Sequence, residues 1–245
     1  MQCLSADQIL QVWELGQTQH PIDRALTLLG FALPDRSRQA LSRLSIGQRD
    51  ALLLRLRQRM FGEAMESFAV CPSCGESLEF TLKATELRLV EPSLAEPPAY
   101  EWSIADYTLT VTLPTSQDLA AVVDCSDLAT AQATLTQRCI QQVSCAGVAI
   151  APHSLPDAVL QQLAQQMADS DPQAELGLDL TCPACQSDWQ VVFDIATFFW
   201  TELSVQAKRL LREVHRLARS YGWREADILA MSAMRRQFYL DLVDA

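Results

Sequence analysis

Two Cys-X-X-Cys pairs are the residues of this sequence best suited to chemistry. The first pair is Cys71 and Cys74, in CPSCG, and the second is Cys182 and Cys185, in CPAC. Zinc prefers four tetrahedral ligands, and two thiolates in one tight turn can supply two of them. A segment with strand periodicity follows each pair, and 107 residues separate the pairs. The pattern predicts one structural Zn²⁺ bound by all four cysteines, in a zinc ribbon with a large insertion.

The residues between and after the cysteines suit such turns. Pro72 and Pro183 restrict the backbone inside each turn, and Gly75 tolerates the left-handed backbone that aims amide groups at thiolate sulfur. One pair alone would be weak evidence for a metal. Two pairs of the same form, each leading into a strand, make the metal site the strongest prediction from the sequence.

Two other chemistries use similar cysteines. A redox dithiol of the thioredoxin kind begins a helix after a strand, whereas both pairs here precede strands. A catalytic zinc keeps one position open, and four cysteines fill all positions. His20, His153 and His215 have no spaced His or Glu partner, and no nucleotide-binding or GxSxG motif occurs. We therefore expect no catalytic residues and no enzymatic activity, with a thiol oxidoreductase as the second alternative.

The remaining cysteines and the N-terminus indicate the compartment. The N-terminus, MQCLSADQILQVW, lacks the features of a signal peptide, so we expect a cytoplasmic protein with reduced thiols. No stretch approaches the roughly 20 apolar residues that a membrane span needs. Four single cysteines stand among apolar neighbours, and we expect them to be buried as small hydrophobes: Cys3, Cys125, Cys139 and Cys145.

The charge balance bears on the class of partner. The chain has 30 acidic and 19 basic residues, and its net charge of −11 opposes binding to nucleic acid. Arg209, Arg212, Arg216 and Arg219 follow helical spacing, and a solvated face or a protein contact is favoured there over phosphate binding. A zinc-ribbon regulator or nucleic-acid-binding module is the first alternative function, and it would need a basic face that overrides the global charge.

Helical signals dominate the first 70 residues. A capping box of Ser5 and Gln8 begins a helix that stops near Gly16. Pro21 begins a second helix, which ends before Pro34. Two more helices are expected at 36–43 and at 46–69, and the last one leads directly into the first cysteine pair.

The middle of the chain mixes both periodicities. After the first pair, SLEFTLK alternates as a strand does, and a hairpin is expected between Tyr100 and Pro114. Helices are expected to begin near Ser116 and Pro156. The segments LGLDLT and SDWQVVFDI then predict strands on either side of the second pair.

The C-terminal segment reads as a long helix and a final helix broken near Ser232. The predicted fold class is α+β and mainly helical, with a zinc-ribbon-like element flanked by N- and C-terminal helices. Four parts follow from this interpretation: an N-terminal helical segment at 1–70, a split zinc ribbon at 71–90 and 175–197, an inserted hairpin and helices at 91–174, and C-terminal helices at 198–245.

Several stretches resemble a known family. They are RDALLLRLRQRMFGEAMES before CPSCGESLEF, then CPACQSDWQVVFDIATFFWTEL, and finally the YGW, IL.MS and RR..YL.L patterns near the C-terminus. These are similar to the T4-type baseplate proteins of contractile phage tails and phage-tail-like contractile injection systems. The resemblance implies a component or assembly factor of the baseplate hub, built in the bacterial cytoplasm, without catalytic activity of its own.

The resemblance also implies the partners. We expect other baseplate and tail proteins, and no nucleic acid, membrane or small-molecule substrate. The C-terminal helices would then present a docking surface, for which the candidate contact residues are Trp223, Arg235, Arg236 and Tyr239. Aromatic and arginine side chains are suited to this role because they dominate binding hot spots.

Overall fold

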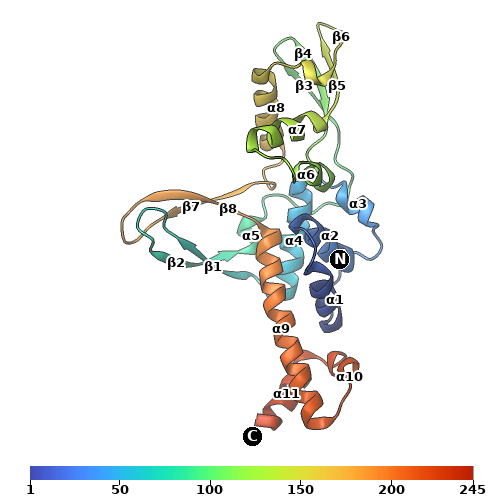
Figure 1. Cartoon of the computed structure of the whole chain (residues 1–245), viewed down its shortest axis with the longest axis vertical. Helices are drawn as coiled ribbons and strands as arrows, with labels where there is room; N and C mark the ends of the chain where they lie inside the picture. The colour runs from blue at the N-terminus through green and yellow to red at the C-terminus, as the bar shows by residue number, and fades with distance from the viewer. Residues whose placement is uncertain (245) are drawn as a thin grey trace. The chain divides into compact units, whose positions relative to one another are not determined.

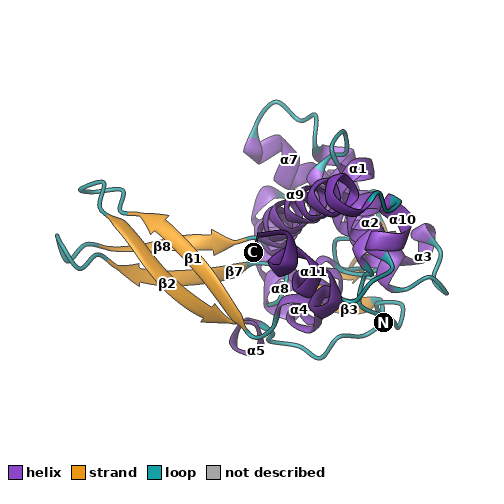
Figure 2. Cartoon of the chain, turned by 90° about the horizontal axis from the view of Figure 1, so that it is seen from below, coloured by secondary structure: helices purple, strands orange, loops and turns teal. Residues whose placement is uncertain are grey.

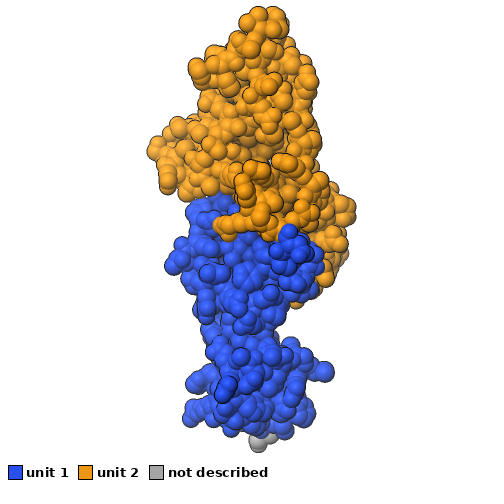
Figure 3. Space-filling model, turned by 90° about the vertical axis from the view of Figure 1, so that its right-hand side faces the viewer, with its two compact units in different colours: residues 1–35, 196–245 blue, residues 36–195 orange. Residues whose placement is uncertain are grey.

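This computed structural model describes residues 1–244, and the chain divides into two compact units (Figure 3). One unit comprises residues 1–35 and 196–245, and the other comprises residues 36–195. The fold is mixed α/β and about half helical (Figure 1). Among the described residues, no helix combines the length and apolar character required to cross a membrane.

The N-terminal helices of the first unit begin and end as predicted. Helix α1 (Ala6–Gly16) has the capping box, in which Ser5 Oγ accepts a hydrogen bond from the Gln8 amide. Helix α2 (Pro21–Ala32) has proline in its first turn. Gly16 lies against the Trp200 indole, because a Cβ on Gly16 would stand 2.1 Å from that ring. The guanidinium of Arg24 lies over the same ring and donates to the Gly16 carbonyl.

The long helix α9 (Ile195–Tyr221) contributes an apolar stripe to this unit. It ends at Gly222, which has a φ of +68° and donates its N–H to the Ala218 carbonyl. Helices α10 (Glu225–Leu229) and α11 (Ala233–Asp244) follow, so the break predicted near Ser232 is confirmed. The stripe recurs at three- and four-residue spacing and consists of Phe199, Leu203, Ala207, Leu210, Val214 and Leu217.

The second unit corrects one predicted helix. After α3 (Arg38–Ser42), helix α4 runs from Ile46 to Phe61, so the prediction of helix through residue 69 is wrong. Gly62, with a φ of +90°, ends the helix, and strand β1 (Ala64–Val70) follows. Met65 and Ala69 are buried while residues 66, 68 and 70 are exposed, which is strand alternation. The first cysteine pair therefore follows a strand.

Each cysteine pair occupies the turn of an antiparallel hairpin. Strand β1 pairs with β2 (Ser77–Lys83), and β7 (Leu176–Thr181) pairs with β8 (Asp188–Phe193). The strands predicted after the first pair and around the second are confirmed. The two hairpins lie side by side with their turns at the same end (Figures 1 and 2). We call these two hairpins, with their turns, the arm.

The insertion between the hairpins contains a four-stranded antiparallel sheet in the order β3-β4-β5-β6. Strands β3 (Tyr100–Ile104) and β4 (Tyr107–Val111) form the predicted hairpin. Strands β5 (Ile140–Cys145) and β6 (Val148–Ala149) were not predicted from the sequence. Because β5 begins at the residue after a helix ends, its pattern merges with that of the helix.

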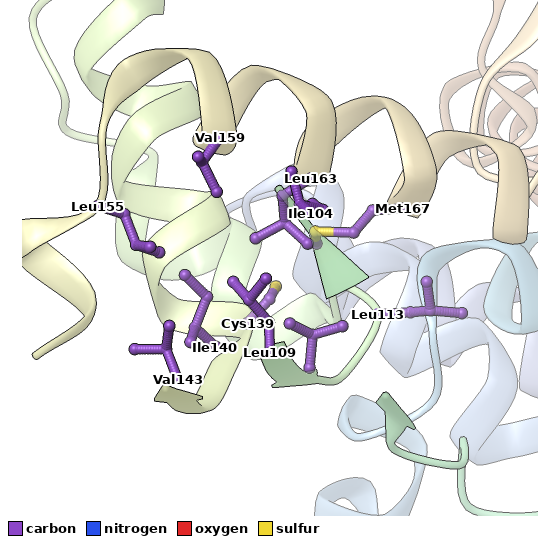
Figure 4. Close-up of a cluster of buried hydrophobic side chains, with 11 residues drawn as sticks. Ile104, Leu109, Leu113, Cys139, Ile140, Val143, Leu155, Val159, Leu163 and Met167 are labelled. Carbon is purple, nitrogen blue, oxygen red and sulfur yellow. The ribbon is translucent and has the colours of Figure 1, made fainter. Parts of the chain in front are cut away.

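Helices α6 (Ser116–Val122), α7 (Leu128–Cys139) and α8 (Asp157–Ser170) complete the insertion. Asp127 caps α7 and separates it from α6. Side chains of α8 point toward the sheet and α7, and enclose an apolar core (Figure 4). Its members are Ile104, Leu109, Val111, Leu113, Cys139, Ile140, Val143, Leu155, Val159, Leu163 and Met167. The short helices α5 (Ala84–Leu87) and η1 (Pro152–Ser154) lie in connections.

Buried polar contacts join α4 to the insertion. Asp171, just after α8, accepts a hydrogen bond from the Gly47 amide at 2.9 Å. Arg49 pairs with Asp50 at 2.7 Å and donates to Ser116 Oγ at 3.4 Å. Burial raises the pKa of Asp50 to about 6, although the Arg49 guanidinium opposes this shift.

The raised pKa of Asp50 makes stability depend on pH. The folded chain favours the protonated carboxyl of Asp50. The contribution of this group to the free energy of unfolding is therefore fully present below pH 3.8 and is lost as pH rises through about 6. Between pH 4 and 7, the unfolding free energy of the wild type should fall relative to Asp50→Asn by on the order of 3 kcal/mol. Urea denaturation of both proteins at each pH measures the difference. A difference that is constant across this range contradicts the assignment.

Candidate metal centre

The structure brings the four predicted ligands together at the turns of the arm. The sulfur atoms of Cys71, Cys74, Cys182 and Cys185 all lie within 4.8 Å of one another. Two of the separations cross between the hairpins: Cys71 to Cys185 and Cys74 to Cys182, each at 3.6 Å. Tetrahedral zinc with bonds of about 2.3 Å needs sulfur atoms about 3.8 Å apart. Small side-chain movements bring this cluster to that geometry.

The two turns have the same backbone hydrogen bonds. The Cys71 amide donates to the Glu76 carbonyl at 2.8 Å, and the Cys182 amide donates to the Ser187 carbonyl at 2.9 Å. In both turns the acceptor lies five residues after the first cysteine. The turns are thus two copies of one local structure, and each presents its first cysteine to the second cysteine of the other.

The residue after the second cysteine has a positive φ in both turns. Gly75 has a φ of +76° and Gln186 a φ of +60°, and each donates its N–H to the carbonyl of the first cysteine of its turn, at 2.9 Å. The left-handed backbone expected at Gly75 is confirmed, and glycine adopts it without strain, although the Gly75 N–H donates to a carbonyl oxygen. Gln186 adopts the same left-handed backbone at a steric cost, because its Cβ lies close to the following carbonyl oxygen.

The four thiols differ in exposure. Cys71 and Cys182, the first residues of the pairs, are buried, whereas Cys74 and Cys185 are exposed. A metal ion would thus be shielded on one side by the hairpins and reached from solvent on the other.

Hydrogen bonding prepares one thiol to ionise. The Ser187 hydroxyl, 3.3 Å from Cys185 Sγ, and the Ser187 amide lower the pKa of Cys185 to about 6. The hydrogen bond from the Glu76 amide lowers the pKa of Cys74. The neighbouring thiols and desolvation together have the larger, opposite effect and raise this pKa to about 12. Thiolates are the metal-binding form, so the hydrogen bonds from Ser187 favour ligation by Cys185. The role of Ser187 was not predicted from the sequence, although Ser187 follows Cys185 by two residues, just as Glu76 follows Cys74.

This donor set fits a structural metal. Four thiolates suit zinc or iron, and they leave no coordination position for substrate or water. Within residues 1–244, no other group of three or more His, Cys, Asp or Glu side chains is placed to hold an ion. Of the single cysteines, Cys139 is buried, Cys125 and Cys145 are half-buried, and Cys3 is exposed, so the expectation of burial is wrong for Cys3.

Three of the four candidate contact residues lie in an aromatic group after α9. Trp223 stacks on Tyr221 with ring centroids 4.4 Å apart, and the edge of Tyr239 meets Trp223 at 4.8 Å. Arg235 is exposed, and its guanidinium lies 5.8 Å from the centroid of the Tyr239 ring. Their contact with a partner stays a prediction.

Arg236 differs from these three. Its side chain is buried, where it pairs with Glu213 at 3.0 Å and donates to the Met231 carbonyl at 2.6 Å. Glu213 also accepts from Arg209, so one carboxylate joins α9 to α11. Arg236 therefore stabilises the packing of these helices, and its guanidinium is not available at the surface.

Comparison with known proteins places most of the chain in a family. No curated protein and no solved structure matches the chain. A family model described as "T4 bacteriophage base plate protein" matches residues 33–200, which include the arm and the entire insertion. The match covers more than half of the chain and confirms the resemblance noted in its sequence. The chain therefore belongs to the T4 bacteriophage base plate protein family.

Proposed function

We propose that this protein is a non-enzymatic structural component or assembly factor of the baseplate of a contractile phage tail or contractile injection system. The observation that carries the proposal is the family match over residues 33–200. The protein is made in the cytoplasm, is incorporated into the particle or assists its assembly, and acts by docking to other baseplate proteins. The proposal involves no membrane, nucleic acid or small-molecule substrate.

In the proposed docking role, the four cysteines bind one structural zinc ion that stabilises the arm. An isolated two-stranded hairpin is at best marginally stable in water. Each hairpin of the arm has two strands, and the four sulfurs lie where the turns of the two hairpins meet. Zinc bound there joins the hairpins as the two halves of a zinc ribbon. The arm then becomes a rigid surface on which a partner can dock.

Ligation also restricts the unfolded chain. Cys74 and Cys182 are separated by 107 residues, and a permanent cross-link closing a loop of this size removes about 4 to 5 kcal/mol of chain entropy. Binding energy for the metal is available only when both turns are formed. Metal binding therefore favours the folded arm and the closed insertion together.

Particle assembly tests the proposed function. Disrupting the gene in the phage or strain that encodes it should leave particles without complete baseplates, as seen by electron microscopy. Restoring the wild type or Cys3→Ser should restore assembly, because Cys3 lies outside the metal centre. Restoring Cys71→Ser/Cys182→Ser should not. Complete, contractile particles in the disrupted strain would rule out the proposed function.

Metal content tests the site itself. The purified protein should contain about one zinc ion per chain, measured by elemental analysis, because four thiolates complete one tetrahedral shell. Removing the metal with a chelator under reducing conditions should lower the unfolding free energy by about 4 kcal/mol.

Variants provide the matched comparison for this test. Cys71→Ser should lose the metal and resemble the chelated wild type, whereas Cys3→Ser should keep both metal and stability. Full stability after the metal has been removed, or equal metal content in the two variants, would show that the four thiols do not form a structural site.

The backbone of the second turn gives a further prediction. Gln186→Gly should stabilise the folded protein by about 1 kcal/mol, because glycine adopts a φ of +60° without steric cost. The loss of the hydrogen bond from the Gln186 side chain to the Pro183 carbonyl reduces this gain slightly. Gly75→Gln, the reverse change in the first turn, should destabilise by a similar amount. Thermal unfolding of the two variants should shift in opposite directions, and shifts of the same sign contradict the comparison.

A further inference from the structure

One face of α9 carries exposed positive charge. Lys208, Arg212 and Arg219 recur at helical spacing on the side opposite the buried stripe, and all three are exposed. Val205, 66% exposed, lies on the same face one turn before Lys208. Within the described chain, no carboxylate pairs with these three cations. We call these four residues the basic stripe.

The outer face of the β1–β2 hairpin carries the opposite charge. Phe68 is 76% exposed and lies directly across from Glu79 in the strand register. Glu66 is on the same face, two residues before Phe68. Among residues 1–244, neither carboxylate pairs with a lysine or arginine. We call Glu66, Phe68 and Glu79 the acidic face.

The charge of each region extends beyond these few side chains. Residues 63–83 and 175–194, which contain the arm, hold eight acidic residues and one lysine. Residues 205–219 of α9 hold five basic residues and one glutamate. A chain with a net charge of −11 thus has an excess of basic residues in this part of α9 and an excess of acidic residues in the arm.

We propose that the basic stripe of one copy binds the acidic face of a second copy. Phe68 packs on Val205, and the carboxylates of Glu66 and Glu79 face Lys208 and Arg212. Each surface then consists of one exposed apolar side chain beside charges of a single sign, and the two signs are complementary. This association goes beyond the proposed function and does not require it.

The symmetry of such a contact follows from its two different surfaces. Each copy offers one basic stripe and one acidic face, so the contact is heterologous and repeats from copy to copy. The assembly is a closed ring or an open chain of copies. The charges are exposed, so salt screens them over about 8 to 10 Å near physiological ionic strength. Association is therefore strongest in dilute buffer.

Sedimentation velocity on the full metal-loaded chain tests the proposal. The wild type should form species larger than a monomer as concentration rises at low salt, and high salt should dissociate them. Glu66→Lys/Glu79→Lys removes the acidic face, and Lys208→Glu/Arg212→Glu removes the basic stripe. Each variant alone should remain monomeric. An equimolar mixture of the two should associate again, because the intact basic stripe of one variant meets the intact acidic face of the other, and the two reversed surfaces are also opposite in charge.

Two further variants separate this contact from general charge effects. Glu96→Lys/Glu101→Lys makes the same change in net charge at exposed positions outside the arm, so it should associate as the wild type does. Phe68→Ala should weaken association by about tenfold, as expected for an apolar side chain at the centre of a contact. Circular dichroism and thermal unfolding confirm that every variant is folded.

Several outcomes would overturn the proposal. A wild type that stays monomeric at low salt shows that the two surfaces do not bind each other between copies. Association of either reversal variant alone places the contact elsewhere, and so does a mixture that remains monomeric. These measurements use only the purified protein, so they can fail while the test of particle assembly succeeds.

Discussion

The convergence of four cysteine sulfurs at the turns of two hairpins is the constraint on which the arm depends. Each hairpin has only two strands, and large apolar side chains in these strands, such as Leu78, Phe80 and Trp189, are only half-buried. Apolar burial of this kind is too incomplete to order four short strands by itself. A metal bound by ligands from both turns would supply the missing connection at the point farthest from the rest of the unit.

A second constraint acts at the other end of the insertion. Asp171 bonds to the first-turn amide of α4, so the chain leaving α8 returns to the helix that precedes the arm. The approach is close, because a Cβ on Gly47 would stand 1.8 Å from the Asp171 carboxylate. A carboxylate at a helix N-terminus is favoured by the helix dipole, which offsets part of the cost of burying Asp171. This contact therefore ties the C-terminal end of the insertion to α4.

The sequence predicted the parts of this structure that have local chemical signals. The cysteine spacing identified the site, and the capping box at Ser5 and the proline at Pro21 placed two helices correctly. Strand β1 was missed because helical spacing before Gly62 was continued through AMESFAV. Strand β5 was missed because only its pairing with β4, across more than 25 residues, identifies it as a strand. Long-range pairing leaves little trace in a local pattern.

The sequence does not show which of the two adjacent arginines on α11 is exposed for docking. Arg235 and Arg236 have the same chemistry, but consecutive residues on a helix point about 100° apart. Arg236 is buried in its ion pair with Glu213, whereas Arg235 is exposed beside the half-buried ring of Tyr239. The family match ends at residue 200, so this ring and the basic stripe lie beyond it. The family model therefore describes the arm and the insertion, whereas the C-terminal contacts depend on residues outside the matched range.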